Sequence, residues 1–372
     1  MENYNALWLY LARIKGLKPA TIEKLLSYFE SIDAVFKQKT FPPELKVSKE
    51  AQLAIKNPQL NSVEKDLKWL EGADNYILTI NDTCYPPLLK QAQSPPIVLF
   101  VTGNPDVLLQ PQLAVVGSRN ASSIGLENTH SFCYNLSCKG LVVTSGMALG
   151  VDGKAHQAAL DAGGQTIAVM GTGLDSVYPA KHRDLAHYIA ERGALISEFP
   201  IGTPAKASNF PRRNRIICGL SLGTLVVEAA MKSGTLITAR QTMEINRPVM
   251  TIPGSIHNPL AKGCHHLIKQ GAKLVESADD IYEELTPLAH SLSLQIKEKL
   301  SIIDNLAVKS APLSDINKEH FAVLEKINYE PTSIDEIILK TKLTAQEVSS
   351  ILLILELDDL IHALPGAQYI RI

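Results

Sequence analysis

Between about residue 86 and residue 275, short apolar runs alternate with longer segments of helical periodicity. Apolar runs of four or five residues predict buried strands, and the longer segments predict helices that cover them. This alternation is typical of a mostly parallel sheet with helices on both faces. We therefore expect an α/β fold with a Rossmann-like, doubly wound sheet, whose ligand lies at the carboxyl ends of the strands. The strands are expected at 97–101, 113–116, 141–144, 166–170, 194–197, 224–227 and 249–252, and the helices at 122–137, 151–161, 183–191, 212–219, 235–246 and 263–270.

A chain of 372 residues is longer than one compact core usually organises, so flanking domains are expected. Residues 1–85 predict a small helical domain of the helix-hairpin or SAM-like kind, which we interpret as a packing module because it lacks a dense basic cluster. Residues 86–288 predict the Rossmann-like core, 289–313 a linker, and 314–372 a winged-helix-like domain. In that last domain, Ser333 and Glu336 predict a capped helix start. Helices are also expected around 321–327 and 348–357, and a small hairpin is expected from 360–361 and 368–371 around Pro365-Gly366.

The composition, with 45% hydrophobic and 20% charged residues, is that of an ordinary globular protein. No apolar stretch approaches the ~20 residues that cross a bilayer, so no membrane partner is expected. The five cysteines are odd in number and scattered, which favours a reduced, cytoplasmic protein. Adjacent Cys264, His265 and His266, even with His257 nearby, do not predict a metal site, because neighbouring ligands rarely close one tetrahedral shell.

Positive charge is concentrated in one part of this chain, whose formal net charge is −2. Residues 201–275 contain ten Lys and Arg against two Asp and Glu, a local balance of +8. Such a concentration suggests an anionic partner, although a solvated basic surface is the alternative. The centre of the stretch is Phe210-Pro211-Arg212-Arg213-Asn214-Arg215. Its aromatic residue, and the glycines and strand-like segments around it, favour a binding surface.

Loops rich in small residues follow several predicted strands, among them Gly117-Ser118-Arg119 and Ser145-Gly146. Glycine lets the backbone approach a ligand, and amides at a helix start attract phosphate. Arg119 can clamp a phosphate with two hydrogen bonds. Each loop alone is more often an ordinary turn, and no Walker-type sequence or complete GxGxxG is present, so no cofactor is predicted. Together the loops favour a phosphate-bearing ligand.

A groove lined by Lys206, Phe210, Arg212, Arg213 and Arg215 suits single-stranded nucleic acid. Phosphates would contact the cations, and a base stacked on Phe210 contributes ~1–3 kcal/mol. The neighbours of Phe210, Asn209 and Pro211, predict a loop rather than a core position.

Nothing in the sequence argues strongly for catalysis. The carboxylates Asp152, Asp175, Glu198 and Glu228 are spread one per loop, whereas metal-dependent hydrolysis needs them clustered. Ser145 has no base at a characteristic spacing. Asp152 and His156, four residues apart, are interpreted as a helix-capping acid and a hydrogen-bonded core histidine.

These motifs, in this order, resemble the DNA-processing protein A (DprA/Smf) family from about Tyr85 to Val275, with both flanks also similar. The motifs are Gly117-Ser118-Arg119; Ser145-Gly146-x-Ala148-x-Gly150-x-Asp152-x-x-Ala155-His156; Tyr178-Pro179; Ser197-Glu198-x-Pro200; Phe210-x-x-Arg213-Asn214-Arg215-Ile216-Ile217; Val227-Glu228-Ala229; and Ser233-Gly234-x-Leu236-Ile237-Thr238-Ala239.

The resemblance implies a homodimer that binds single-stranded DNA without cutting it, protects incoming strands during natural transformation and helps to load the recombinase RecA. It places phosphate contacts at Ser118 and Arg119, at Ser145 and Gly146, and on the basic loop and helix. The last group matches Lys206, Phe210, Arg213 and Arg215. His182 and the Cys264-His265-His266 run depart from the usual family pattern.

Two other functions remain open. Leu222-Gly223-Thr224 followed by Glu228 is similar to the phosphate loop of phosphoribohydrolases in the lysine-decarboxylase-like superfamily, which would make the protein a nucleotide-processing enzyme. This chain lacks their paired glycines and spaces the acid differently. The second alternative is an adaptor that acts through its tail, since residues 315–372 carry five basic and ten acidic residues, and a DNA-reading winged helix is normally basic.

Overall fold

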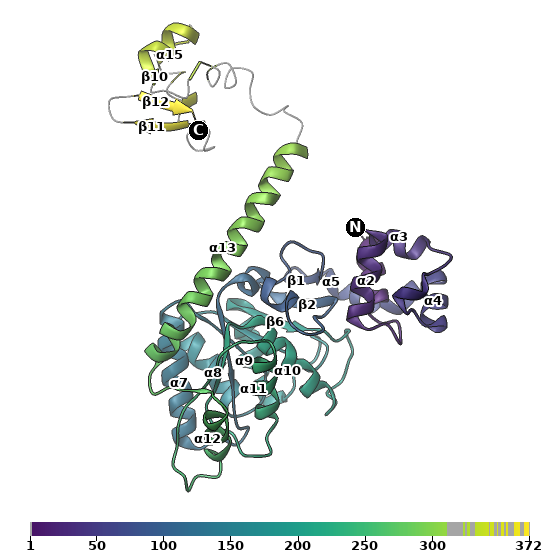
Figure 1. Ribbon diagram of the computed structural model, residues 1–372, viewed down its shortest axis with the longest axis vertical. Helices are drawn as coiled ribbons and strands as arrows, with labels where there is room; N and C mark the ends of the chain where they lie inside the picture. The colour runs from purple at the N-terminus through teal and green to yellow at the C-terminus, as the bar shows by residue number, and fades with distance from the viewer. Residues whose placement is uncertain are drawn as a thin grey trace. The chain divides into compact units, whose positions relative to one another are not determined.

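The computed structural model describes residues 2–310 and, beyond them, residues 323, 326–327, 332–341, 343–345, 348, 351–352, 355, 361–364 and 368–371. The chain divides into two compact units, Met1–Lys297 and Glu298–Ile372. Figure 1 shows the elements of each unit. The long helix α13 (Ala278–Ser310) runs through the boundary between them and contains most of the segment predicted as a linker. The predicted domain limits stay predictions.

A nine-stranded sheet forms the centre of the first unit. Its strand order is β1-β2-β6-β5-β4-β3-β7-β8-β9, with β1–β2 and β2–β6 antiparallel and the remaining pairs parallel. The strands are β1 (Asn75–Thr79), β2 (Val98–Gly103), β3 (Gln112–Val116), β4 (Val142–Ser145), β5 (Thr166–Val169), β6 (Ala194–Ser197), β7 (Gly223–Val226), β8 (Val249–Thr251) and β9 (Lys273–Leu274). All seven predicted strands are present, and the mostly parallel sheet is confirmed.

The two strands that the sequence analysis missed lie at the edges of the sheet. β1 has a half-exposed burial pattern, and the two residues of β9 are exposed. Edge strands are covered on fewer sides, so they do not need the continuous apolar run by which central strands were recognised.

Helices cover both faces of the sheet, because successive side chains of a strand point to opposite sides. In β3, Leu113 and Val115 belong to the apolar cluster that includes α7 and α8, whereas Ala114 and Val116 belong to the cluster that includes α10 and α11. The helices of the core are α6 (Pro87–Lys90), α7 (Ser123–Cys138), α8 (Val151–Asp161), α9 (Arg183–Arg192), α10 (Asn209–Leu220), α11 (Gly234–Glu244) and α12 (Lys262–Lys269).

The helix α10 begins three residues earlier than predicted. Phe210 therefore lies in its first turn, and the prediction of a loop there was wrong. Pro211 misled the analysis, because proline usually ends a helix. In the first turn, however, its missing N–H has no acceptor to lose.

The strand order reverses direction beside β3. From β3 the chain passes through α7 to β4, β5 and β6 on one side, whereas β7, β8 and β9 continue on the other side. The loops that follow β3 and β7 therefore leave the sheet toward opposite faces. A crevice opens between them at the carboxyl ends of the strands, which is the expected position of a ligand in such folds.

The N-terminal helices pack into the same apolar cluster as the core. They are α1 (Glu2–Leu11), α2 (Pro19–Phe29), α3 (Ile32–Lys37), α4 (Lys49–Lys56) and α5 (Glu64–Leu70). Asp66 of α5 is fully buried, pairs with Arg13 and accepts the Ile201 N–H at 2.9 Å. This carboxylate ties the N-terminal helices to the segment that leads into α10.

The second unit contains a three-stranded antiparallel sheet in the order β10-β12-β11. Its described elements are β10 (Thr332–Ser333), α15 (Ile334–Thr341), β11 (Ile361–Leu364) and β12 (Gln368–Arg371). The β11–β12 pair is the predicted C-terminal hairpin. The Glu336 N–H donates to Ser333 Oγ at 3.3 Å, which confirms the predicted cap. The helices predicted around 321–327 and 348–357 lie largely outside the described residues.

Candidate nucleic-acid interface

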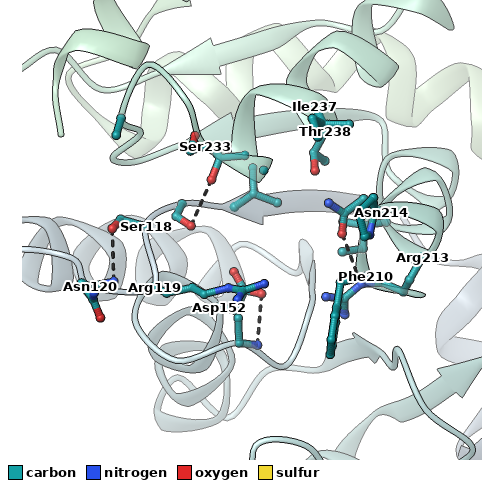
Figure 2. Close-up of a pocket in the computed structure, with 18 of the residues that line it drawn as sticks. Ser118, Arg119, Asn120, Asp152, Phe210, Arg213, Asn214, Ser233, Ile237 and Thr238 are labelled. Carbon is teal, nitrogen blue, oxygen red and sulfur yellow. Dashed lines mark hydrogen bonds between the residues drawn. The ribbon is translucent and has the colours of Figure 1, made fainter. Parts of the chain in front are cut away.

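A cavity of about 440 Å³ occupies the crevice beside β3. Its walls come from the loop after β3, from α10 and from the first turns of α11. Figure 2 shows Arg119 and Phe210 on facing sides of it. Among the predicted site residues, the cavity is lined by Gly117, Ser118, Arg119, Phe210, Arg213 and Asn214.

One face of α10 lines this cavity. Phe210, Arg213, Asn214 and Ile217 follow the spacing i, i+3, i+4, i+7, which places them on one side of a helix. Asn214 Oδ1 accepts a hydrogen bond from Arg213 Nε at 3.3 Å. The sequence analysis expected Phe210 and Arg213 to line one groove, and both line the cavity. It could not predict that they share one face of a helix, because it began that helix at residue 212.

Arg119 and Phe210 are in contact in the wall of the cavity. The guanidinium carbon of Arg119 lies 5.8 Å from the centre of the Phe210 ring, within the range of a cation–π contact. The ring of Tyr178 lies 5.7 Å from the same ring, tilted by 41°. A Cβ at Gly171 would come within 2.9 Å of the Phe210 ring, so glycine gives the ring its place. A cationic group and an accessible aromatic ring thus stand side by side.

A second hollow of about 230 Å³ adjoins the first and shares Arg119, Phe210 and Arg213 with it. Its other walls are mostly apolar and include Met147 and Leu149. The two hollows therefore meet at the Phe210 ring, and each has both polar and apolar walls. Such a pair can accept both the phosphate and the base of a nucleotide unit.

Arg213 lies beneath the cavity, with 5% of its surface exposed. Its guanidinium donates to the carbonyl of Val169, and burial lowers its pKa to about 10, which still leaves it charged at neutral pH. The neighbouring Asp152 accepts the Ala148 N–H at 3.2 Å. Burial raises the pKa of Asp152, and the charge of Arg213 opposes that rise. A Cβ on Gly146 would come within 2.5 Å of both side chains, so Gly146 leaves room for this buried pair.

Ser145 does not line either hollow. It is fully buried, and its hydroxyl donates to the Val115 carbonyl at 2.6 Å. That bond joins β4 to β3, so the side chain has a structural partner already. Its predicted contact with phosphate stays a prediction, and the structure supplies no geometry for it.

The histidine of the same region is a core residue, as interpreted from the sequence. His156 is fully buried, with Nε2 2.6 Å from the Gly146 carbonyl and Nδ1 2.7 Å from Thr166 Oγ1. Burial lowers its pKa to about 4, so the ring is neutral at pH 7. Because a carbonyl can accept but not donate, the proton is on Nε2. The ring therefore holds the Gly146 loop in place from below.

The other predicted cations lie away from the cavity. Glu198, whose side chain is 4% exposed, accepts from Arg212 Nη2 at 2.8 Å and pairs with Arg215 through the same oxygen. Arg215 also donates to the Ser94 carbonyl. Lys206 is exposed in the segment between β6 and α10. The structure thus brings Phe210 and Arg213 to the cavity and leaves Lys206, Arg212 and Arg215 outside it.

Glu228, the acid of the alternative enzyme hypothesis, anchors a helix. Its carboxylate accepts the Ser122 N–H at 2.9 Å and the Ser122 hydroxyl at 2.6 Å, next to the first turn of α7. Asn258 Nδ2 lies 3.4 Å from the same group. The carboxylate is buried and is not part of the cavity wall.

The sequence analysis gave no role to the wall that α11 contributes. Ser233, Gly234, Thr235, Ile237 and Thr238 line the cavity, and the Thr235 hydroxyl donates to the Gly117 carbonyl at 3.1 Å. The available signal was a serine and a glycine directly before a helical segment, the usual residues of an N-terminal cap.

Among the described helices, none combines the length and the apolar composition that a bilayer-spanning helix requires.

Comparison with known proteins follows the same division of the chain. The family model for DNA recombination-mediator protein A matches residues 76–286, and the DprA winged helix domain matches residues 307–367. The winged-helix expectation for the C-terminal region is thereby confirmed. Protein Smf of Escherichia coli (strain K12) is 39% identical over 370 residues, covering 98% of this chain and 95% of the relative.

Two solved structures extend the comparison. The X-ray structure of DNA processing protein A from Streptococcus pneumoniae has a TM-score of 0.64 and 38% identity, covering 75% of this chain and 97% of the other. A structure of DNA processing protein A from Helicobacter pylori, described in terms of its single-stranded DNA binding mode, has a TM-score of 0.52 and 26% identity. It covers 57% of this chain and 96% of that chain.

Proposed function

The chain belongs to the family of DNA recombination-mediator protein A (DprA/Smf), and from that premise we propose that it binds single-stranded DNA in the cavity beside β3 and leaves the strand intact. The observation that carries the proposal is the guanidinium of Arg119 beside the Phe210 ring. A phosphate meets the first group while a base stacks on the second. The single-stranded DNA binding described for the Helicobacter pylori protein supports this substrate.

The surroundings of the acidic residues support a binding role without catalysis. Asp152 bonds to a backbone amide beside Arg213, Glu198 pairs with two arginines, and Glu228 anchors the start of α7. A general base or a metal ligand needs a carboxylate directed at the substrate. These three have other partners, which argues in particular against Glu228 as the acid of a phosphoribohydrolase.

The cellular role follows from the family. We propose that the protein acts as a homodimer in natural transformation, protects incoming strands and assists RecA loading in the cytoplasm. All five cysteines are unpaired, which suits a reducing compartment.

A binding series tests the proposal. Fluorescence anisotropy with matched single- and double-stranded oligonucleotides is measured across a salt series for the wild type, Arg119→Ala and the control Arg192→Ala. Arg192 is exposed at the end of α9, away from both hollows. We expect a preference for single strands, and a salt slope that is smaller by about 0.7 in Arg119→Ala, the value of one lost phosphate contact. Equal affinity and slope for all three proteins would overturn the site.

Intact recovery of the labelled strand, and no release of base from nucleoside monophosphates, are expected in the same samples. Hydrolysis of a monophosphate by the wild type, lost in a Glu228→Gln variant, would favour the enzyme instead.

A further inference from the structure

The N-terminus of α11 opens onto the cavity without a cap. Ser233 occupies the capping position, but its side chain makes no capping hydrogen bond. Its Oγ is buried and has no hydrogen-bond partner in the described part of the chain. Apart from its chain neighbours and the backbone of its own helix, no atom lies within 4 Å of the position that a Cβ on Gly234 would take, so the rest of the protein leaves this side of the first helical residue open.

A second hydroxyl, one turn further along α11, points into the same space. Thr238 is 1% exposed as a residue and lines the cavity. Figure 2 shows its oxygen directed into the cavity on the side of Asn214. A buried polar group normally has a partner, and one that lacks it requires an explanation. The unpartnered Ser233 hydroxyl, together with a second hydroxyl that faces the same cavity, indicates a missing hydrogen-bond acceptor.

The electrostatics of this corner favour an anion. The first amides of a helix have no intrahelical acceptor, and the helix dipole places partial positive charge there. The Thr235 hydroxyl binds the Gly117 carbonyl, which holds the helix end against the loop that carries Arg119. Asp152, the acid in the cavity wall, already bonds to the Ala148 amide and lies beside Arg213.

We propose that the N-terminus of α11 is a phosphate subsite, in which the amides of its first turn and the hydroxyls of Ser233 and Thr238 bind the oxygens of one phosphate group. The phosphate belongs either to the bound strand, next to the one at Arg119, or to a free nucleotide. The first source rests on the proposed function, and the second does not.

The test uses the full chain with Ser233→Ala and Thr238→Val combined. Thr238→Val keeps the shape of the side chain, Ser233→Ala shortens it by one atom, and each change removes one hydroxyl from the cavity wall. The control combines Ser31→Ala, which removes the cap of α3, with Thr286→Val on α13. The probes are a labelled dT oligonucleotide and, as competitor, dTMP. We expect the subsite variant to bind the oligonucleotide at least about tenfold more weakly than the wild type, since hydrogen bonds to charged groups are lost.

Thermal stability separates binding from structure. Removing hydroxyls that stabilise no part of the protein is expected to leave Tm unchanged or to raise it, whereas a purely structural role would lower Tm. If dTMP displaces the oligonucleotide from the wild type but not from the variant, the phosphate in the subsite comes from a free nucleotide. Weaker oligonucleotide binding without dTMP competition identifies the strand.

The subsite is refuted if the variant and the wild type bind the oligonucleotide and dTMP with equal affinity. It is also refuted if the variant binds more weakly only to the extent that its lowered Tm explains. A wild type that binds dTMP but no oligonucleotide would overturn the proposed function and leave the subsite standing.

Discussion

The buried pair of Arg213 and Asp152 allows a prediction that separates structure from binding. In Arg213→Met the hydrophobic stem is retained, and Asp152 loses the cation that opposes its burial. The variant also loses the bond to the Val169 carbonyl. We expect it to be destabilised because a buried charge without a partner is costly, typically by ~3–5 kcal/mol.

The pH sets an upper limit on the share of this destabilisation that comes from the unpaired charge of Asp152. Its carboxyl can instead be protonated on folding, at a cost of about 1.36 kcal/mol for each pH unit above its ordinary pKa of 3.8. That limit is about 4.4 kcal/mol at pH 7 and about 1.6 kcal/mol at pH 5. A raised native pKa lowers stability as pH rises, so the defect of the variant must shrink by up to about 3 kcal/mol on going from pH 7 to pH 5.

Urea unfolding of the wild type, Arg213→Met, and Arg213→Met combined with Asp152→Asn measures this difference. The double variant should recover most of the loss at pH 7 and show a defect independent of pH. A single variant whose defect is equal at both pH values would refute the reasoning.

Three further results are expected. Because the native pKa of His156 is lowered to about 4 from 6.5, the free energy of unfolding should fall by about 3 kcal/mol as pH drops from 6.5 to 4. Urea titrations of His156→Gln should show a weaker pH dependence, and an equally steep loss of stability in this variant would exclude the histidine as its cause. Glu198→Gln removes the acid that pairs with Arg212 and Arg215, so anisotropy should show tighter oligonucleotide binding and a steeper salt slope. Weaker binding by a folded variant would show instead that Glu198 holds the two arginines in the positions that binding needs. Deleting residues 314–372 should leave oligonucleotide affinity unchanged; a loss of more than about tenfold (~1.4 kcal/mol) would assign the C-terminal domain to the interface.

The central architecture could be predicted from the sequence because its signals are local. A strand buried on both faces needs a continuous apolar run, and all seven predicted strands are of this kind. The loop at Gly117 was predicted to be a ligand contact because it follows such a strand, and it lines the cavity. Edge strands such as β9 carry no comparable pattern, because they are covered on fewer sides.

The composition of the site was only partly predictable, because it depends on helix phase and on long-range partners. Arg212 and Arg213 are neighbours in sequence but lie on different faces of α10, and Glu198 determines the environment of the first. Similarly, Thr238 is a candidate ligand contact only because it lines a cavity whose walls come from segments more than a hundred residues apart in the sequence. Neither relation can be obtained from spacing within a single segment.

The claim that a strand lies across the Phe210 ring can be tested most directly by photo-crosslinking. A single-stranded oligonucleotide carrying 5-iododeoxyuridine is irradiated with the full-length protein, and the crosslinked peptides are identified by mass spectrometry. We predict that crosslinks form at Phe210 or Tyr178 and are lost when excess unlabelled single strand is added. Competed crosslinks confined to the N-terminal helices or to the C-terminal domain would contradict the account.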